Sequence, residues 1–292
     1  MPELPEIESY IHSLSERITG ATLDTVRIGS FSLLRTFDPP IEAVFGSTVE
    51  DLHRIGKRIS IDLSGDLHLV IHLMVAGRFK WTEGPKPLPK RGRLASFDFS
   101  TGSLLLTEAG TKRRASLSVI RSKDLASVDP GGIEVSTATA KQFREALLTS
   151  RHTLKRALTD ARYISGVGGA FADEILHAAK LSPTQMNTNL SDTEITALFR
   201  ATKRILNKWT KKRIQETGEG FPTKVTAFHP DMTVHGKFGE PCPVCGAPIQ
   251  RIVAGARETN YCPGCQTGGK ILADRSLSRL LKDDWPRTLE EL

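Results

Sequence analysis

The sequence predicts an α+β protein of several domains: an N-terminal helix with an antiparallel β-sandwich, a helical helix–two-turn–helix domain and a C-terminal zinc ribbon. Three observations predict this fold class. Apolar residues recur at helical spacing near the N-terminus, short alternating segments continue to about residue 125, and two Cys-x2-Cys pairs lie near the C-terminus. The expected domain ranges are 1–128, 129–235 and 236–270, followed by a C-terminal extension over 271–292.

The composition is that of a folded protein with a polyanionic partner. The chain has 292 residues, a formal net charge of +7 and a pI of about 9.3. Basic charge favours nucleic acid among possible partners, although many basic enzymes never bind it. We find no signal peptide and no apolar run of membrane-spanning length, so we expect a cytoplasmic, bacterial-type, nucleoid-associated monomer without membrane contact.

The first element expected is an amphipathic helix over residues 2–18. Its apolar stripe is formed by Leu4, Ile7, Ile11, Leu14 and Ile18. Pro2 lies at the helix start, and Glu3 and Glu6 lie in the first turn, where the helix dipole favours carboxylates.

Pro2 gives this helix start a possible chemical function. Removal of Met1 before such a small residue leaves a secondary amine, and α-amino groups titrate near pH ~7.7–8.0. A neutral amine can attack an electrophilic carbon and form an imine-type intermediate, with Glu3 and Glu6 as acid or base. The alternative is that Pro2 only begins the helix, where its missing N–H is not needed.

Alternating apolar and polar residues predict short antiparallel strands between residues 21 and 125. The expected strands are 22–28, 58–63, 67–73, 94–99 and 103–107, with hairpin turns at Gly65-Asp66 and Thr101-Gly102. A basic loop rich in Pro and Gly, residues 83–93, contains Arg91. Such a set of strands is typical of a sandwich or barrel.

Beyond a linker at 129–132 the pattern becomes helical, with helices expected at 138–149, 153–164, 170–179 and 191–216. Ser191 and Glu194 form a capping box at the start of the last helix. Its basic row is either a solvated face or a phosphate-binding one, and consists of Arg200, Arg204, Lys208 and Lys211.

A glycine-dense segment, residues 164–174, joins two short helices. Glycines there leave backbone N–H groups exposed at the start of the second helix, which favours phosphate binding by Gly168 and Gly169. The alternative is that these glycines only allow close helix packing.

All four cysteines occur in the pattern Cys242-x2-Cys245 and Cys262-x2-Cys265, separated by sixteen residues. This spacing is typical of a zinc ribbon, in which four thiolates hold one structural Zn²⁺ with no open coordination position. The alternative, two disulfides, is disfavoured in a cytosolic protein.

Several of these motifs together resemble the formamidopyrimidine-DNA glycosylases and the related endonuclease VIII enzymes over roughly residues 1–268. The resemblance rests on the opening MPELPEIE, on Gly56-Lys57-Arg58, on His72-Leu73, on Lys155 followed by SGVGGAFADEIL, and on Arg257 in GARETNYCPGC. It implies a bifunctional glycosylase and lyase that acts on damaged double-stranded DNA.

The resemblance also implies roles for individual residues. Pro2 would attack C1′ of the damaged nucleotide, Glu3 would protonate the opening sugar, and Glu6 would position groups around the imine. Lys57 would bind phosphate and assist strand cleavage, and Arg257 would bind phosphates flanking the lesion. Further DNA contacts are assigned to Met74, Val75, Arg91, Arg113, Arg114, Arg151, Lys155, Gly168 and Gly169.

The sequence departs from the family pattern in four places. Val75, with Met74 beside it, replaces the methionine expected to fill the space of the rotated base. Arg113 or Arg114 stands for the family's arginine in the opposite-strand loop, which lacks the usual phenylalanine. Gly169 replaces an asparagine. A C-terminal extension of about 27 residues follows Cys265; its apolar residues predict a helix and packing of Trp285 on the ribbon, with partner binding as the alternative.

Three functions are compatible with the sequence. The leading hypothesis is excision of a damaged base through a Schiff base on Pro2, followed by β,δ-elimination. The second is a damage- or structure-specific DNA-binding protein of the same fold with weak or no excision. The third is a zinc-ribbon protein that acts on RNA or ribosomes through its basic helix.

Overall fold

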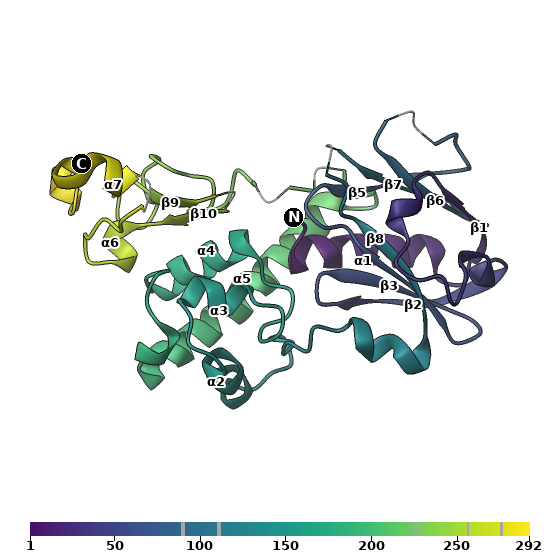
Figure 1. The fold of residues 1–292 in the computed structure, drawn as a ribbon, viewed down its shortest axis with the longest axis horizontal. Coiled ribbons are helices and arrows are strands. Elements are labelled where there is room, and N and C mark those ends of the chain that lie inside the picture. Colours follow the sequence, from purple (N-terminus) through teal and green to yellow (C-terminus); the bar gives the residue numbers. More distant parts are fainter. Residues whose placement is uncertain (89–90, 110–111, 224, 227, 256, 275–276) are drawn as a thin grey trace. The chain divides into compact units, whose positions relative to one another are not determined.

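The computed structural model describes residues 1–292 except 89–90, 110–111, 224, 227, 256 and 275–276 (Figure 1). Its contacts divide the chain into two compact units. Unit 1 comprises Met1–Pro130 and Trp209–Thr226, and unit 2 comprises Gly131–Lys208 and Ala227–Leu292. The two units are described separately below.

Unit 1 opens with helix α1, Leu4–Ile18. The helix begins two residues later than predicted because Glu3 has an extended backbone and serves as the N-cap residue. The Glu3 backbone N–H donates to Glu6 Oε2 at 2.9 Å. Four residues of the predicted apolar stripe are buried and Leu4 is half-buried, so one face of α1 packs into the core.

Eight strands of unit 1 form one antiparallel sheet in the order β5-β7-β6-β1-β2-β3-β4-β8. Strands β1 and β2 pair over only two residues each, so the sheet consists of two four-stranded layers joined at that edge. The strands are β1 Thr22–Ile28, β2 Ser47–Ile55, β3 Arg58–Leu63, β4 Leu67–His72, β5 Gly77–Thr82, β6 Arg93–Phe99, β7 Gly102–Glu108 and β8 Ser116–Arg121.

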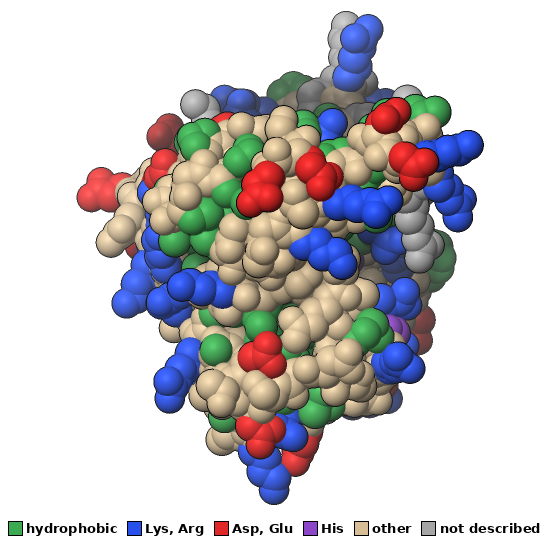
Figure 2. Space-filling model, turned by 90° about the vertical axis from the view of Figure 1, so that its left-hand side faces the viewer, with side chains coloured by type: hydrophobic (Ala, Val, Ile, Leu, Met, Phe, Trp, Pro, Cys, Tyr) green, Lys and Arg blue, Asp and Glu red, His purple; other side chains and the backbone are tan. Residues whose placement is uncertain are grey.

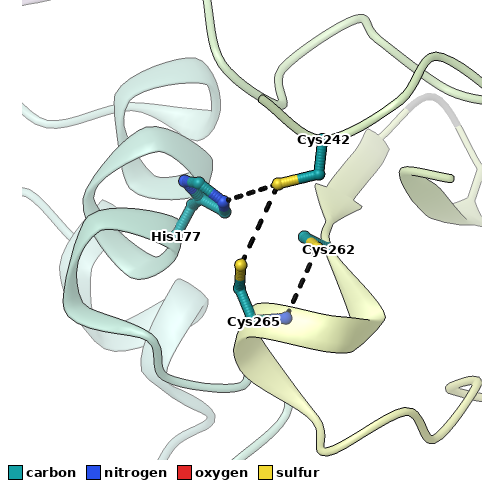
Figure 3. A group of neighbouring side chains, drawn as sticks. All are labelled: His177, Cys242, Cys262 and Cys265. Carbon is teal, nitrogen blue, oxygen red and sulfur yellow. Dashed lines mark hydrogen bonds between the residues drawn. The ribbon is translucent and has the colours of Figure 1, made fainter. Parts of the chain in front are cut away.

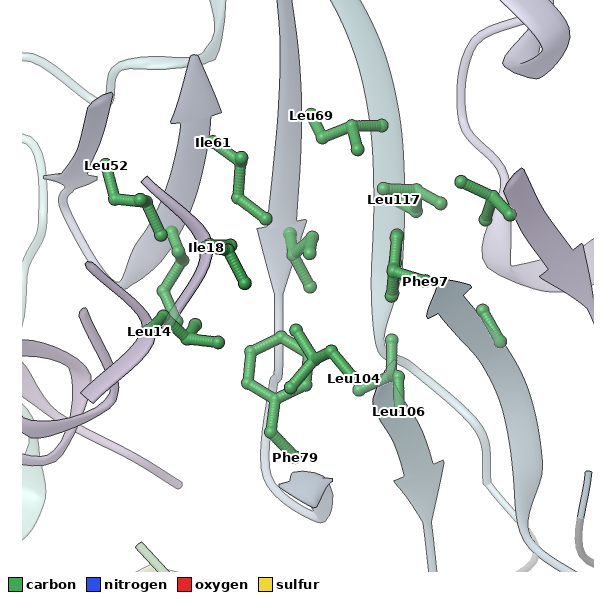
Figure 4. Packing of buried hydrophobic residues seen from close by; sticks show 14 of the residues in the cluster. Leu14, Ile18, Leu52, Ile61, Leu69, Phe79, Phe97, Leu104, Leu106 and Leu117 are labelled. Atoms are coloured by element: carbon green, nitrogen blue, oxygen red, sulfur yellow. The ribbon is translucent and has the colours of Figure 1, made fainter. Parts of the chain in front are cut away.

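The core of unit 1 lies between the two layers and under α1 (Figure 4). Leu14 and Ile18 extend from the helix toward Ile61 and Leu69 on one layer, and Phe97 extends from the other. All five side chains are completely or almost completely buried. Burial of a large apolar side chain contributes about 1.5–3 kcal/mol, so this cluster fixes the helix that carries the N-terminus.

Two local features of the sheet differ from the prediction. Strands β2, β5 and β8 had not been predicted. The β6–β7 turn is formed by Ser100 and Thr101, because Phe99 pairs with Gly102. Gly102 is needed for another reason: a Cβ there would lie 2.4 Å from the Trp81 ring.

Unit 2 contains the helices α2 Ala140–Leu148, α3 Leu154–Thr159 and α4 Gly169–Ala179, and the first part of α5, Asp192–Thr217. Helix α3 ends earlier than predicted because the Asp160 side chain accepts from the Arg162 backbone N–H, which forms a turn. The predicted capping box of α5 is present, since Glu194 N–H donates to Ser191 Oγ and Ser191 N–H donates to Glu194 Oε2.

The C-terminal part of unit 2 holds a β-hairpin, β9 Gln250–Ala254 and β10 Arg257–Tyr261, followed by α6, Pro263–Gln266. The extension forms α7, Leu277–Leu281, and then returns to the ribbon, where the Leu289 N–H donates to the Gly269 carbonyl. Short 3-10 helices complete the chain: η1 Phe31–Leu33, η2 Ile41–Val44, η3 Ser122–Val128, η4 Asn187–Asn189, η5 Lys282–Asp284 and η6 Leu289–Glu291.

Two further features concern helix hydropathy and the distribution of charge. Within the described ranges, no helix combines the length and apolarity needed to cross a bilayer. Figure 2 shows one face on which Lys and Arg side chains lie near both edges with Asp and Glu side chains among them. The positive charge is therefore not gathered into one patch on this face. The functional surface has to be located from the positions of individual residues.

Candidate active site and zinc centre

The N-terminal residues of unit 1 form a buried acidic cluster. Pro2 is buried, and the exposed fractions of Glu3 and Glu6 are 3% and 2%. Carboxylates are rarely buried without compensating partners. The start of α1 thus holds two buried carboxyl groups close in sequence to Pro2, the predicted nucleophile.

Arg213 from the last turns of α5 is the cation that faces this cluster. Its Nε donates to Glu6 Oε1 at 3.3 Å, and its NH2 group donates to the Thr226 carbonyl at 3.0 Å. Burial, then the charge of Glu3, raises the pKa of Glu6 to about 7, although Arg213 and the Glu3 N–H act in the opposite direction. Glu6 therefore changes protonation near neutral pH, as a general acid or base requires.

Charged groups of this cluster also affect the pKa of the N-terminal amine. Burial lowers the pKa of the Met1 amine, Arg78 and Lys57 lower it further, and Glu3 and Glu6 oppose this shift. A lowered pKa increases the neutral, nucleophilic fraction at a given pH.

Lys57 is placed by the tight turn between β2 and β3. Ile55 pairs with Arg58, so Gly56 and Lys57 form a two-residue turn, and Gly56 has φ +63°. Glycine with positive φ at this position is typical of a type II′ hairpin turn. Burial lowers the pKa of Lys57, while the negative charge of Glu3 opposes this shift.

His72 at the end of β4 is a further polar group near Lys57. Burial lowers its pKa to about 4, and the charges of Arg58 and Lys57 act in the same direction. Its Nε2 atom is buried and has no hydrogen-bond partner within the described part of the chain. A neutral imidazole with an unused buried nitrogen is suited to bind a ligand oxygen.

The two predicted wedge residues lie in the turn between β4 and β5. Val75 is 57% exposed, whereas Met74 is half-buried and has φ +52°. The turn is tight, since a Cβ at Gly77 would lie 2.3 Å from the Leu73 carbonyl oxygen. The Arg78 side chain donates to the Val75 carbonyl at 3.2 Å, which stabilises the turn.

The remaining basic candidates of unit 1 are exposed. Arg91, Arg113 and Arg114 all lie at the surface. The end of the loop is fixed because the buried Glu108 side chain accepts from the Arg114 N–H at 2.9 Å and from the Ala115 N–H at 3.1 Å. The structure therefore leaves the arginine side chains available for a ligand.

In unit 2 the glycine-dense turn leads directly into α4. Gly168 is the N-cap residue, and Gly169 is the first helical residue and is exposed. A Cβ at Gly169 would have no neighbour within 4 Å, so close packing does not require glycine there. Gly168 in the same turn is buried, so phosphate binding and close helix packing both stay predictions for this turn. Arg151, which precedes α3, is also exposed.

The Lys155 ammonium group already contacts other residues of the protein, whereas a side chain that only binds phosphate would be unpaired. Its Nζ lies 2.7 Å from Asp173 Oδ1 and donates to the Glu258 carbonyl at 2.7 Å. Asp173 is 1% exposed. Lys155 thus makes one ion pair and one hydrogen bond within the protein.

The acidic pair on α4 connects this helix to the ribbon. Asp173 Oδ2 lies 2.8 Å from His235 Nδ1 and accepts from the Asn260 N–H at 3.1 Å. Glu174 accepts from backbone N–H groups of Thr233, Val234 and His235 at 2.8–3.0 Å. Arg257, at the start of β10, remains exposed.

The four cysteines are free thiols gathered at one point of unit 2, and Figure 3 shows three of them, Cys242, Cys262 and Cys265. The sulfur–sulfur distances are 3.9 Å for Cys242 and Cys265 and 3.3 Å for Cys245 and Cys262. Ligands at ~2.3 Å from a tetrahedral ion lie about 3.8 Å apart. Four soft sulfur donors at this spacing fit Zn²⁺, which would cross-link the two Cys-x2-Cys pairs.

Sequence reasoning missed several groups that complete these sites: Arg78, Asp173, Glu174, His177 and Arg213. The sequence could have drawn attention to Arg213, because it lies in the part of the last predicted helix that contains no acidic residue. Its partner Glu6 is 207 residues away, so only the tertiary structure reveals the pair.

Comparison with known families gives three matches in succession along the chain. Residues 1–116 match the formamidopyrimidine-DNA glycosylase N-terminal domain, residues 129–218 match the H2TH domain of the same enzyme, and residues 239–268 match the zinc finger found in FPG and IleRS. Together with the cysteine cluster, the last match confirms the predicted structural zinc.

Curated relatives extend the similarity to most of the chain. A formamidopyrimidine-DNA glycosylase from Heliobacterium modesticaldum is 31% identical over 282 residues and covers 91% of this chain and 100% of its own length. The enzyme from Desulforamulus reducens is 29% identical over 279 residues, with 91% and 99% covered. An uncharacterized formamidopyrimidine-DNA glycosylase-like protein from Mycobacterium tuberculosis is 37% identical over 153 residues, with 52% and 93% covered.

Solved structures show the same fold. The complex of Lactococcus lactis Fpg with DNA containing an abasic site has a TM-score of 0.79 at 26% identity, with 91% of this chain and 99% of that chain covered. A MutM complex with DNA containing carbocyclic 8-oxo-G gives the same score and identity, with 91% and 100% covered. These similarities confirm the predicted fold class and the predicted resemblance: the chain belongs to the formamidopyrimidine-DNA glycosylase family.

Proposed function

We propose that this protein is a bifunctional DNA glycosylase and abasic-site lyase of base excision repair, which acts as a monomer on damaged double-stranded DNA. The observation that carries the proposal is the group of charges around the N-terminus. Glu3, Glu6, Lys57 and Arg78 all act on the pKa of the Met1 amine, one residue before Pro2. Membership of the glycosylase family supports the same assignment.

The nucleophile of the proposed reaction is the secondary amine of Pro2 after removal of Met1. Its lone pair attacks C1′ of the damaged nucleotide, the bond from C1′ to the base breaks, and the base leaves with a proton. Glu3 protonates O4′ as the sugar ring opens, which gives an iminium between Pro2 and C1′. Pro2 is buried, and burial of an amine favours its neutral form.

Strand cleavage follows from the iminium. The positive nitrogen withdraws electrons, so a proton is lost from C2′ and the 3′-phosphate departs in the β-elimination. A second elimination expels the 5′-phosphate and leaves a gap. Lys57, in the two-residue turn between β2 and β3, would neutralise a departing phosphate.

Glu6 and Arg213 are positioning residues in this scheme. The Glu6 carboxylate accepts from the Glu3 N–H, and Arg213 holds Glu6 from the other side. Together they fix the backbone that carries the nucleophile. A reacting group held in one orientation reduces the entropic cost of the attack.

The amine can reach C1′ only when the nucleotide is rotated out of the duplex, which costs a few kcal/mol. Phosphate contacts from Arg257, Arg151 and the Gly168–Gly169 turn would offset that cost without reading sequence. Val75, exposed on its turn, is the stronger candidate to occupy the vacated space, with Met74 beside it. His72 Nε2 is a further candidate for a DNA oxygen.

Borohydride trapping on a duplex with one abasic site tests the proposal, because hydride reduces the iminium to a stable amine. The wild-type protein should form a covalent adduct, and Pro2→Gly should lose it. Pro5→Ala, in the first turn of the same helix, is the matched control and should retain trapping. A protein that binds the duplex tightly and forms no adduct would instead be a damage-specific binding protein.

The zinc ribbon has a structural role in this proposal. Cys242, Cys245, Cys262 and Cys265 would hold one Zn²⁺, which supplies a cross-link and takes no part in the chemistry. The ribbon hairpin carries Arg257, and Asp173 connects that hairpin to α4 because it accepts from the Asn260 N–H. Phosphate binding by Arg257 thus depends on an intact metal site.

A further inference from the structure

His177 on α4 lies against the cysteine cluster (Figure 3). Its Nε2 atom is 3.4 Å from Cys242 Sγ, and the residue is 6% exposed. The histidine therefore points into the zinc site from the helical part of unit 2. The four-cysteine pattern of the sequence gives no indication of this fifth group.

The donor atoms of His177, Cys242, Cys262 and Cys265 all lie within 4.8 Å of one another. This set alone contains one nitrogen and three sulfur donors, the composition of a known class of structural zinc sites. The fourth thiol, Cys245, also borders the cluster, since its sulfur lies 3.3 Å from Cys262 Sγ. A tetrahedral ion at this point has one more neighbouring donor than it can bind.

The donors differ in exposure. Cys242 and Cys262 are buried and Cys265 is half-buried, whereas Cys245 is exposed. A zinc-bound thiolate at the surface is the one that solvent, competing ligands and electrophiles reach first. His177 approaches the cluster from the protein interior.

We propose that His177 is a reserve ligand of this zinc site. With four thiolates bound, its Nε2–H donates to the Cys242 thiolate. When Cys245 is lost as a ligand, the Zn–S bond to Cys245 breaks and the ring nitrogen binds in its place. The departing thiolate takes a proton from water. The neutral ring changes tautomer through water, because Nε2 gives up its proton and Nδ1 takes one.

Ligation by His177 would connect the metal directly to helix α4. Gly169 begins this helix, and eight residues at 1.5 Å per residue place it about 12 Å along the axis from His177. The metal would thus remain joined to the element that carries the phosphate-binding turn even without Cys245. This inference rests on the zinc site and not on the proposed catalytic activity.

Metal analysis of the full-length chain tests the proposal. After dialysis against a weak chelator, Cys245→Ser should retain about one zinc per chain, as the wild type does. Cys242→Ser and the double variant Cys245→Ser/His177→Gln should lose it. Equal zinc in the Cys245→Ser protein and the double variant would overturn the proposal, and so would loss of zinc from a folded Cys245→Ser protein.

Cobalt substitution reports the ligand set independently of activity. In Co²⁺-loaded Cys245→Ser the thiolate-to-metal charge-transfer absorption should fall by about a quarter, since three of four thiolates remain, while the tetrahedral visible bands persist. Loss of the tetrahedral bands would indicate that no fourth protein ligand replaces the thiolate, which contradicts the proposal.

The rate of zinc transfer to EDTA provides a test that does not require substitution of any cysteine. His177→Gln keeps an N–H donor but is a poor zinc ligand, so it should release zinc several-fold faster than the wild type. His12→Gln, on an exposed part of α1, is the control. Release from His177→Gln at the wild-type rate would show that the ring only donates a hydrogen bond and would refute ligation.

Discussion

Arg213 Nε lies 3.3 Å from Glu6 Oε1, with the two side chains 9% and 2% exposed. Residues 207 positions apart in the sequence thus form a buried ion pair beside the N-terminus. Removal of one partner from such a pair leaves an uncompensated buried charge. Burial raises the pKa of Glu6, and the charge of Arg213 from the end of α5 opposes this shift.

The first prediction concerns this pair. Arg213→Ala removes the charge that lowers the pKa of Glu6, so this pKa rises above about 7. The acid limb of the single-turnover cleavage rate should move to higher pH by about one unit, and the rate at pH 7 should fall about fivefold. Arg213→Lys should shift the limb less, and exposed Lys211→Ala should not shift it. An unchanged pH profile of the cleavage rate for Arg213→Ala would contradict the positioning role of Arg213.

The second prediction links Glu6 to stability. Its folded-state pKa is raised from 4.5 to about 7. The folded state therefore binds the proton more tightly than the unfolded state between these values, and stability falls as pH rises through this window. From pH 4.5 to 8 the wild type should lose about 2–3 kcal/mol more unfolding free energy than Glu6→Gln, as measured by urea denaturation. Equal losses would show that Glu6 is ionised throughout.

The third prediction separates two basic residues of unit 2. Arg257 is exposed, so Arg257→Ala should lower the salt dependence of DNA binding by about one unit of slope without loss of thermal stability. Lys155 is paired with buried Asp173, so Lys155→Ala should also destabilise the protein, by about 3 kcal/mol. Lys123→Ala, at the surface of unit 1, is the control. Equal stability of the Lys155 and Arg257 variants would contradict the buried pairing.

The fourth prediction concerns the turn between β4 and β5. Val75 is 57% exposed, so Val75→Ala should depress excision from duplex DNA several-fold while excision from a single strand changes little. Met74→Ala should have the smaller effect, because Met74 is half-buried. An equal loss on duplex and single strand would show that neither side chain fills the space of the rotated nucleotide.

The sequence was informative where function depends on neighbouring residues. Cys242 and its three partners follow a spacing that the metal geometry requires. Strands 22–28 and 58–63 were predicted with the bounds that the structure has, since alternation marks strands with one buried face. The roles of Pro2 and Glu3 stay predictions until they are tested in solution.

Features that depend on distant contacts were not predictable. Strand β2 was missed because polar residues such as Glu50 and Asp51 interrupt its alternation. His177 lies 65 positions from Cys242 and occurs in an otherwise ordinary helix pattern. The sequence likewise did not reveal that Lys155 donates to the Glu258 carbonyl, because that contact exists only once the hairpin packs on α4.

Mass spectrometry of the borohydride-trapped N-terminal peptide tests the central claim most directly. The account predicts a peptide that begins at Pro2, without Met1, and that carries the reduced sugar remnant on the Pro2 nitrogen. A peptide that retains Met1, or an adduct on Lys57 in place of Pro2, would contradict it.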